Sequence, residues 1–509
     1  MASGFVELEQ CPLLAHRSED WSKPWIGWVK PDQAGLRILA LDGGGIKGVF
    51  FDLIVGTSAG GIIACGLGPG ELSVEECATK FEALSTKAFS GSAVGKIPLI
   101  GKLVDEMLSV FNHGRYKTKP LEDAYKEAFP ESQKLFGGTS GSATASVKVA
   151  VTTSTRHGRV IVLGNYNRKP PAQAFYDFQR PPPDREMFLW EAARATSAAP
   201  TYFAPFAHSG TSQVYLDGGL WHNNPIRIAD AESRAIWPET KPRKADMMLS
   251  VGAGYHETES TLTEGAQKYQ EQIKAETAVQ DAATWRDNDD YVRFLVSVVL
   301  SQIKSSLSCE RIWHEWLEAR APHQDQNRQR YRRLTVEFPR LVEMDDASKE
   351  TMDVCHEAVK GMESAQFVDV ADRLIASSFF FRFGTEDIVK LSDGRYEVSG
   401  SILCRLRLKS IALLGEHLDS SCKPSSSFRP YFIFRETHED KGSRITIDGA
   451  TIDAMKADGR FELPYEVRIS TVLAETEMLL ILRDERQRPA DAPHISGFPR
   501  KLQEDYDGE

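Results

Sequence analysis

The sequence predicts an α/β protein with a mostly parallel sheet, and three observations lead to this fold class. Short apolar runs recur at 37–41, 51–55 and 213–217, and glycines follow each run, as expected of buried strands that end in tight turns. Segments with helical patterning, such as 74–88 and 118–129, lie between these runs. The composition, 41% hydrophobic and 26% charged, is that of a globular chain with a sizeable core. Strands that alternate with helices favour a parallel sheet.

The other elements of this core follow from the same patterns and from local composition. We expect helices at 60–66, 99–111 and 187–197, strands at 147–152, 159–163 and 246–252, and a flexible loop at 137–146. The segment 99–111 carries an apolar stripe at helical spacing. We expect this helix to face the core, and the alternative is a lid or a helix that lies on a lipid surface.

Changes in composition divide the chain into five parts. The parts are an irregular leader at 1–36, the α/β core at 37–255, a helical extension at 256–365, a β-rich module at 366–483 and a disordered tail at 484–509. β-branched and aromatic residues identify the β-rich module, and Pro, Asp, Glu and Arg identify the tail. The basic run Gln326–Arg333 is expected to be a solvated helix face, with contact to anionic headgroups as the alternative.

Charge and cysteine content restrict the class of protein. Lys and Arg number 61 against 72 Asp and Glu, a formal net charge of −11, so nucleic acid is not an expected partner. Seven scattered cysteines without CxxC spacing favour a reducing, cytoplasmic setting. Because no apolar run reaches roughly 18 residues and the N-terminus lacks a basic start, we expect neither a membrane span nor a secretory signal. A lipid substrate would then require transient, peripheral contact with a membrane surface.

The segment Gly56-Thr-Ser58-Ala-Gly60 matches the pattern G-x-S-x-G and stands between an apolar strand and the start of a helix. Small residues in such a position allow the sharp turn of a nucleophile elbow, which exposes the serine hydroxyl. The amide groups at the start of the helix would face a developing anion. The alternative is an ordinary glycine-rich turn in which Ser58 caps the helix.

A second motif, Asp42-Gly-Gly-Gly-Ile-Lys-Gly48, follows the strand at 37–41. In an acyl hydrolase, the amides of such a loop form an oxyanion hole. The same residues also satisfy G-x-G-x-x-G, the fingerprint of dinucleotide binding. That interpretation requires an acidic residue at the end of the next strand, where this chain has Gly56-Thr-Ser58 instead.

The third motif, Asp217-Gly218-Gly219, ends a predicted strand. If the strands are parallel, its carboxylate shares an edge with the other two motifs and can take the proton of Ser58, as a dyad without histidine. The alternatives are that Asp217 only shapes a turn, or that His222, five residues further on, completes a triad. No His/Cys cluster, H-E-x-x-H segment or Walker A loop is present, so we expect neither a metal nor a nucleotide cofactor.

Four segments in this order resemble the patatin-like phospholipase family: Asp42-Gly-Gly-Gly-x-x-Gly48, Gly56-Thr-Ser-Ala-Gly60, Ala195-Thr-Ser-Ala-Ala-Pro-Thr-Tyr-Phe203 and Asp217-Gly-Gly-Leu-Trp-His-Asn-Asn-Pro225. The resemblance covers roughly residues 37–255, under half of the chain, and four ordered motifs are far more specific than one. It implies a three-layer α/β/α fold. It also implies Ser58 as nucleophile, Asp217 as base and Gly43, Gly44 and Gly45 as the oxyanion hole, with no metal and no cofactor.

The resemblance further implies a reaction. The family hydrolyses acyl esters of phospholipids and related acylglycerols, and water releases the fatty acid from an acyl-enzyme on the serine. We therefore interpret the chain as a lipase or phospholipase A that acts on membrane glycerophospholipids. The segment Asn223-Asn224-Pro225 is assigned a structural role.

One departure from the family concerns the connection between the glycine loop and the nucleophile strand. Family members usually carry a helix of some twenty residues there, whereas Gly43–Phe50 is too short for the dozen or so residues of a parallel crossover. A hairpin instead would place Ser58 near 20 Å from the glycine loop at roughly 3.3 Å per residue. On this reasoning a segment is missing after Gly48, and the chain is weakly active or inactive.

Two rivals to the hydrolase remain open at this stage. One is a catalytically inactive interaction protein on the same scaffold, which the short connection motivates. The other is a nucleotide-dependent oxidoreductase built on the glycine loop. Headgroup preference, the choice between sn-1 and sn-2 esters, protein partners and oligomeric state are not encoded in any pattern that we can interpret.

Overall fold

The protein is described by a computed structural model. The described residues are 5–8, 25–28, 33–42, 51–89, 116–136, 147–155, 158–168, 175–179, 185–200, 202–238, 245–256, 309–323, 326–340, 342, 345–383, 387–406, 408–421, 428–437, 442–483 and 492–502. The expected helix at 99–111, the loop at 137–146 and the glycines at 43–45 lie outside them. The chain divides into two compact units, one formed by Ile38–Pro238 with Leu249–Met362, and the other by Met1–Arg37, Glu239–Met248 and Glu363–Glu509.

A nine-stranded sheet is the centre of the described α/β core, with its main path in the order β11-β10-β3-β4-β5-β6-β7 and with β9 pairing β5 and β8. The strands are β3 (Arg37–Leu41), β4 (Leu53–Thr57), β5 (Lys148–Thr155), β6 (Val160–Gly164), β7 (Asp177–Gln179), β8 (Phe206–His208), β9 (Gln213–Asp217), β10 (Met247–Val251) and β11 (Tyr331–Leu334). Every residue of β3 and β4 is buried, as expected of parallel strands covered on both faces.

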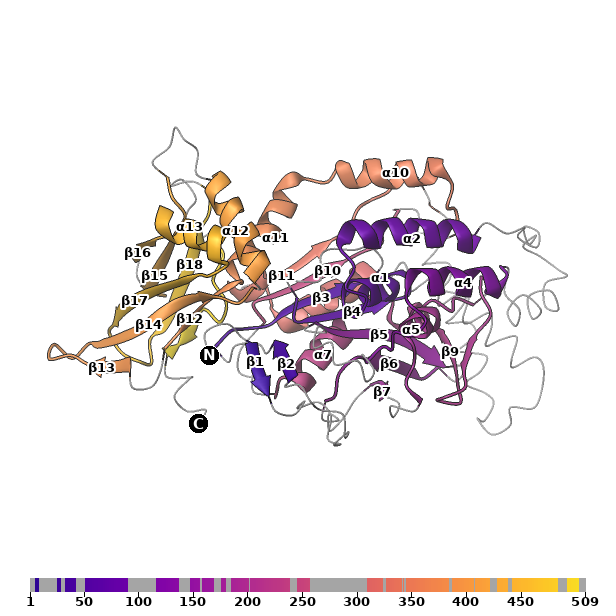
Figure 1. Ribbon diagram of the computed structural model, residues 1–509, viewed down its shortest axis with the longest axis horizontal. Coiled ribbons are helices and arrows are strands. Elements are labelled where there is room, and N and C mark those ends of the chain that lie inside the picture. Colours follow the sequence, from indigo (N-terminus) through magenta and orange to yellow (C-terminus); the bar gives the residue numbers. More distant parts are fainter. Residues whose placement is uncertain are drawn as a thin grey trace. The chain divides into compact units, whose positions relative to one another are not determined.

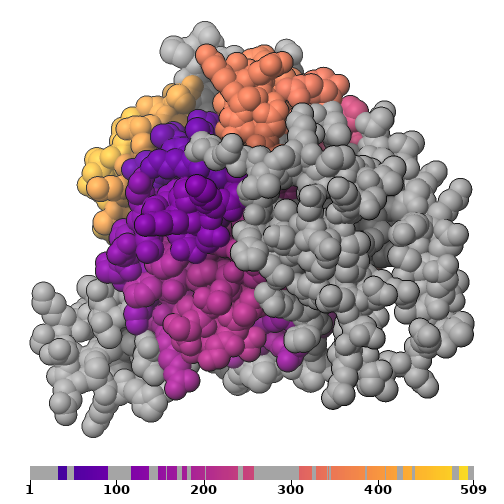
Figure 2. All heavy atoms as spheres, turned by 90° about the vertical axis from the view of Figure 1, so that its right-hand side faces the viewer, coloured from indigo at the N-terminus to yellow at the C-terminus, as the bar shows by residue number. Residues whose placement is uncertain are grey.

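Helices cover both faces of this sheet, so the expected three-layer α/β/α arrangement with a mostly parallel sheet is confirmed (Figure 1). They are α1 (Ala59–Leu67), α2 (Val74–Phe89), α4 (Thr118–Ala128), α5 (Leu189–Thr196), α6 (Gly219–His222) and α7 (Ile226–Ile236). The start of α2 is fixed by a capping box, in which the Ser73 hydroxyl accepts from the Glu76 amide and the Glu76 carboxylate accepts from the Ser73 amide. The purple and magenta segments form a continuous face in Figure 2.

The pairing of β3 with β4 corrects the expectation of a hairpin. The two strands are parallel, with Ile38 opposite Leu53 and Leu41 opposite Gly56. The predicted separation of about 20 Å between Ser58 and the start of the glycine loop is wrong for this reason.

The described part of the segment 256–365, which was expected to be helical, also contains a strand. Residues 309–320 form a helix, followed by the 3-10 helix η4 (Gln326–Arg330), strand β11 and helix α10 (Lys349–Lys360). The basic run Gln326–Arg333 therefore spans η4 and the first part of β11 and is not a solvated helix face. Arg330 is buried, and the Arg333 side chain is 6% exposed. Basic composition suggested a surface, but the pairing of β11 in the sheet and ion pairs with Asp42 and Glu310 bring Arg333 inside.

The described residues between 363 and 502 in the second unit form two small antiparallel sheets and three helices, in agreement with the expected β-rich module. One sheet holds β12 (Phe379–Arg382), β13 (Ile388–Lys390), β14 (Tyr396–Cys404) and β17 (Glu462–Ile469). The other holds β15 (Tyr431–Glu436), β16 (Ser443–Thr446), β18 (Glu475–Ile481) and β19 (Arg500–Lys501). The helices are α11 (Ser364–Ala376), α12 (Leu408–Ser421) and α13 (Gly449–Asp458).

Both ends of the chain depart from the sequence-based expectation. The leader, expected to be irregular, contains the antiparallel pair β1 (Phe5–Leu8) and β2 (Trp25–Trp28). Part of the tail expected to be disordered is ordered: β19 pairs with β18, and Phe498 is fully buried. The Ser496 hydroxyl accepts a hydrogen bond from the Gly35 amide at 2.9 Å. A few apolar residues in a polar segment thus complete a core formed elsewhere in the chain.

The close approach of α1 to the end of β3 gives a testable consequence. A Cβ added to Gly60 would overlap the carbonyl oxygen of Leu41. We expect Gly60→Ala to lower the free energy of unfolding by about 1–3 kcal/mol, although alanine favours helices. Urea denaturation measures this, with Gly449→Ala in α13 as the control, because a Cβ there has nothing within 4 Å. A Gly60→Ala protein as stable as the wild type would contradict the packing of α1 on β3.

Candidate active site

Ser58 lies on a sharp turn between β4 and α1, with φ 53° and ψ −122°. This positive φ is strained for a residue with a side chain, and such strain is found at nucleophile elbows. The turn is possible because its neighbours are glycines: a Cβ at Gly56 would overlap the backbone carbonyl of Gly60. The local sequence therefore produces the strand–turn–helix elbow that G-x-S-x-G predicted.

The side chains of Ser58 and Asp217 are in direct contact. The Ser58 hydroxyl donates a hydrogen bond to Oδ2 of Asp217 at 2.6 Å. The second oxygen, Oδ1, accepts from the backbone N–H of Gly219 at 2.6 Å, which fixes the orientation of the carboxylate. Asp217 is only 3% exposed, so its oxygens have little competition from water. The two residues singled out in the sequence are thus brought together.

The direction of β9 differs from the expectation that all three motifs end parallel strands. β9 runs antiparallel to β5, with Asp217 opposite Thr153, whereas β4 runs parallel to β5, with Thr57 opposite Thr152. β9 pairs only with the last residues of β5, so its C-terminal end still lies level with the end of β4. The carboxylate and the hydroxyl share one edge of the sheet because of this register.

Burial controls the proton affinity of Asp217. Removal from water raises the pKa of its carboxyl group to about 6, against the lowering effect of hydrogen bonds from Ser58 and Gly219. A carboxylate with this pKa is still largely ionised at neutral pH. It is also a better proton acceptor than an exposed Asp, whose pKa is near 3.9, because a general base works best when its pKa is near the working pH.

A network of threonines that the sequence reasoning did not identify supports the elbow. The Ser58 amide donates to Oγ1 of Thr196 at 3.0 Å, and that hydroxyl donates to the carbonyl of Thr152 at 2.7 Å. The Thr57 hydroxyl donates to the carbonyl of His222 at 2.7 Å. Thr196 belongs to the third of the four segments quoted above, and its place in that segment was the available signal for it.

The histidines have other contacts. Nδ1 of His208 lies 3.0 Å from the Thr211 hydroxyl. The ring of His222 packs on Phe175 with centroids 5.6 Å apart, and burial together with Arg227 lowers the pKa of His222 to about 4. His157 lies outside the described residues. Because the Ser58 hydroxyl is directed at a carboxylate, the contacts favour a dyad over the triad considered from sequence.

The expected structural role of Asn224 agrees with its contacts. Its side chain is 1% exposed, and its Oδ1 accepts from the Ile226 amide at 3.0 Å at the start of α7. Its Nδ2 donates to the carbonyl of Cys309 at 3.2 Å. Asn224 therefore joins α7 to the helix at 309–320.

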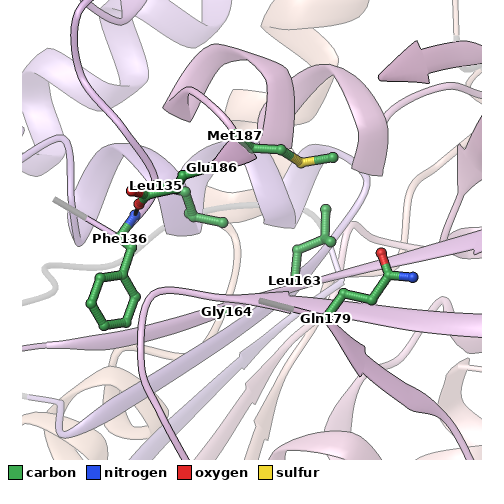
Figure 3. A pocket seen from close by; sticks show the side chains of 7 residues that line it. All are labelled: Leu135, Phe136, Leu163, Gly164, Gln179, Glu186 and Met187. Carbon is green, nitrogen blue, oxygen red and sulfur yellow. Dashed lines mark hydrogen bonds between the residues drawn. The ribbon is translucent and has the colours of Figure 1, made fainter. Parts of the chain in front are cut away.

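Two cavities in the unit that contains the α/β core are not lined by the Ser58–Asp217 pair. The first, of about 10 Å³, is shown in Figure 3 and is at the lower limit for one water molecule. It is lined by Leu135, Phe136, Leu163, Gly164, Gln179, Glu186 and Met187. The second is an open groove beside α10, which includes Phe338 and Val354. Neither is lined by Ser58 or Asp217.

Among the described residues, no group of three or more His, Cys, Asp or Glu side chains is arranged to hold a metal ion. In the same part of the chain, no helix combines the length and the apolar character needed to cross a membrane.

Comparison with known proteins identifies similar sequences. Calcium-independent phospholipase A2-gamma of Oryctolagus cuniculus is 28% identical over 300 residues, which is 53% of this chain and 36% of that protein. Phospholipase A I of Arabidopsis thaliana is 27% identical, covering 43% of this chain and 21% of that protein. The cGAMP-activated phospholipase of Escherichia coli (strain TW11681) is 31% identical, covering 39% of this chain and 55% of that protein. The match thus spans about a third of the length of the first of these relatives.

The family model described as patatin-like phospholipase matches residues 37–230. This range contains β3, the serine elbow and Asp217, and it begins at the first residue of β3. The chain carries a patatin-like phospholipase domain at residues 37–230, and the resemblance drawn from its four motifs is confirmed.

Proposed function

We propose that this chain is a serine acyl hydrolase of the lipase or phospholipase A type, which releases fatty acids from membrane glycerophospholipids or related acylglycerols. One observation carries the proposal: a hydroxyl on a strained elbow donates a 2.6 Å hydrogen bond to a buried carboxylate. The relatives are named as phospholipases, which supports an ester of a lipid as the substrate. Contact with the membrane surface is part of the same proposal, since the substrate is embedded there.

The reaction proceeds in two steps. Asp217 takes the proton of the Ser58 hydroxyl while Oγ attacks the acyl carbonyl carbon. As the tetrahedral intermediate collapses, the ester bond breaks and the lysolipid alcohol leaves with the proton from Asp217. A water molecule then attacks the acyl-enzyme and gives its proton to Asp217. The fatty acid departs as the proton returns to Oγ, which restores the starting state.

Stabilisation of the oxyanion is assigned to backbone amides. The first turn of a helix has amide groups without partners in the helix, and α1 begins at Ala59, directly after the nucleophile. We propose that Gly43, Gly44 and Gly45 supply the remaining donors. Their preceding residue follows β3, which runs parallel to β4 and supports a position on the same edge as Ser58.

Parallel pairing also affects the rival functions. The inactive interaction protein and the impaired enzyme were both motivated by the short connection after the glycine loop, and the argument against activity was that a hairpin would separate Ser58 from that loop. The parallel pairing of β3 with β4 removes the hairpin from this argument. We therefore propose an active hydrolase. Fluorophosphonate labelling of Ser58 separates a hydrolase from an oxidoreductase, which would respond to a nicotinamide or flavin titration instead.

Loss of either member of the pair is expected to abolish hydrolysis. Ser58→Ala removes the nucleophile and Asp217→Asn removes the base, so kcat on a phospholipid panel should fall at least about 10³-fold in each. His222→Ala should retain most of the activity, because no proton transfer is assigned to it. Ser420→Ala, at an exposed site in α12, is the matched control for the serine change.

Two results would contradict this assignment. Full activity in Asp217→Asn together with its loss in His222→Ala would replace the dyad by a triad. Wild-type protein with no hydrolysis and no fluorophosphonate labelling would favour the interaction protein.

The pH dependence of the reaction should report Asp217. Only the ionised carboxylate accepts a proton, and its pKa is raised to about 6 by burial. We expect kcat/KM on a soluble ester to rise about tenfold per pH unit below pH 6 and to level off above it. Because burial also raises the pKa of Asp42 to about 6, the profile is repeated with Asp42→Asn, in which the inflection should remain. A flat profile from pH 4.5 to 8 would count against Asp217 as the base.

Asp217 is expected to destabilise the fold at neutral pH. Its pKa is higher in the folded protein than the ordinary value near 3.9. The free energy of unfolding therefore falls as the pH rises from about 4 to about 6, and the full loss is present above pH 6. Asp217→Asn is therefore expected to raise the free energy of unfolding by about 1–3 kcal/mol at pH 7. Urea denaturation at pH 7 and pH 4 measures this. The gain should disappear at pH 4, and a destabilised variant at pH 7 would contradict the expectation.

A further inference from the structure

Arg333 is a buried arginine on β11, well beyond the residues 37–230 that match the family. Its side chain is 6% exposed and makes hydrogen bonds to three acceptors. Nη2 donates to Oδ2 of Asp42, Nη1 to the hydroxyl of Ser250 and Nε to Oε1 of Glu310, each at 2.7 Å. The guanidinium therefore connects the end of β3 with β10, β11 and the helix at 309–320.

Asp42 is the residue between β3 and the glycines proposed as the oxyanion hole. Its amide donates to the carbonyl of Val251 at 2.8 Å, and its side chain is 2% exposed. The groups that face its carboxylate are Arg333, Glu310 and the thiol of Cys309. Among these three groups, only Arg333 is a cation. The buried carboxylate of Asp42 is tolerated because this opposite charge is hydrogen-bonded to it.

The end of β3 is in turn packed against the serine elbow. A Cβ on Gly60 would overlap the carbonyl oxygen of Leu41, so the backbone before Asp42 touches the first turn of α1. A displacement of Asp42 is therefore passed to the edge of the sheet at which Ser58 lies. Misplacement of reacting groups by about 1 Å can reduce the rate a hundredfold.

We propose that Arg333 is a positioning residue for the reaction, which holds Asp42 and with it the end of β3 that packs against the serine elbow. This inference rests on the proposed hydrolase function. It assigns a role in the reaction to a residue outside the family match. Because Arg333 is buried and its three acceptors lie outside the elbow, its effect is on kcat through geometry and not on substrate binding.

The kinetic test compares Arg333→Gln, Arg333→Lys and the control Arg332→Gln in the full chain, with a soluble ester as substrate. We expect Arg333→Gln to lower kcat about ten- to a hundredfold and to change KM less than about twofold. Arg333→Lys should recover part of the loss, since an ammonium group restores the charge without the three-way contact. Wild-type kcat in Arg333→Gln would overturn the proposal, as would an equal loss in Arg332→Gln.

A double-mutant cycle shows whether the effect passes through Asp42. If it does, Asp42→Asn and Arg333→Gln each reduce kcat, and the double variant is no worse than the poorer single variant. The double variant also leaves no uncompensated buried charge at this pair, so it remains informative if a single variant folds poorly. A double variant whose loss equals the product of the two single losses would overturn coupling through Asp42.

Amide hydrogen exchange provides a readout that does not depend on activity. We expect faster exchange in the peptide covering 37–42 in Arg333→Gln than in Arg332→Gln, because the anchor of Asp42 is lost. Unchanged exchange in that peptide would overturn the proposal. If the wild type does not hydrolyse esters while exchange responds as expected, the function assigned above fails and the anchoring of Asp42 by Arg333 stands.

Discussion

The site depends on the close contact between α1 and the ends of β3 and β4. Glycines make this contact possible: Gly56 and Gly60 leave no room for side chains, and a Cβ on Gly61 would lie 2.6 Å from Thr196. The contact forces Ser58 into a strained conformation that lifts its hydroxyl toward Asp217. Hydrogen bonds from the surrounding threonines maintain this arrangement. Removal of the glycines would therefore affect the fold and the site together, because one piece of packing serves both.

Burial sets the pKa values of the two aspartates at this edge of the sheet. Asp217 and Asp42 are both removed from water, and burial raises the pKa of each to about 6. Their partners differ, however, since Asp217 accepts from a hydroxyl and an amide whereas Asp42 pairs with Arg333. The proposed roles follow from these partners: Asp217, bonded to a hydroxyl, exchanges a proton with the proposed nucleophile, whereas Asp42, bonded to a guanidinium, holds the end of β3.

Sequence reasoning was most successful where the chemistry is local. The elbow at Ser58 is formed by five consecutive residues, and its glycines lack the Cβ atoms that would overlap neighbouring backbone in the turn. Properties set by distant partners were missed: the direction of β9 depends on its register with β5, and β3 pairs with β4 in parallel instead of forming a hairpin. The charge pattern of Gln326–Arg333 gave the wrong environment for Arg333, because composition does not reveal that a carboxylate nearly three hundred residues earlier lies against it.

The same long-range contacts bear on where the α/β core ends. The family match stops at residue 230, yet Trp316 donates to Asp230 at 3.3 Å and Asn224 donates to the carbonyl of Cys309. β10 and β11 extend the central sheet beyond β3, and β11 supplies the cation for a carboxylate next to the nucleophile edge. A chain cut after residue 255 would leave Asp42 buried without its cation. The segment that holds the helix at 309–320 and β11 therefore belongs physically to the α/β core, although composition separated it as an extension.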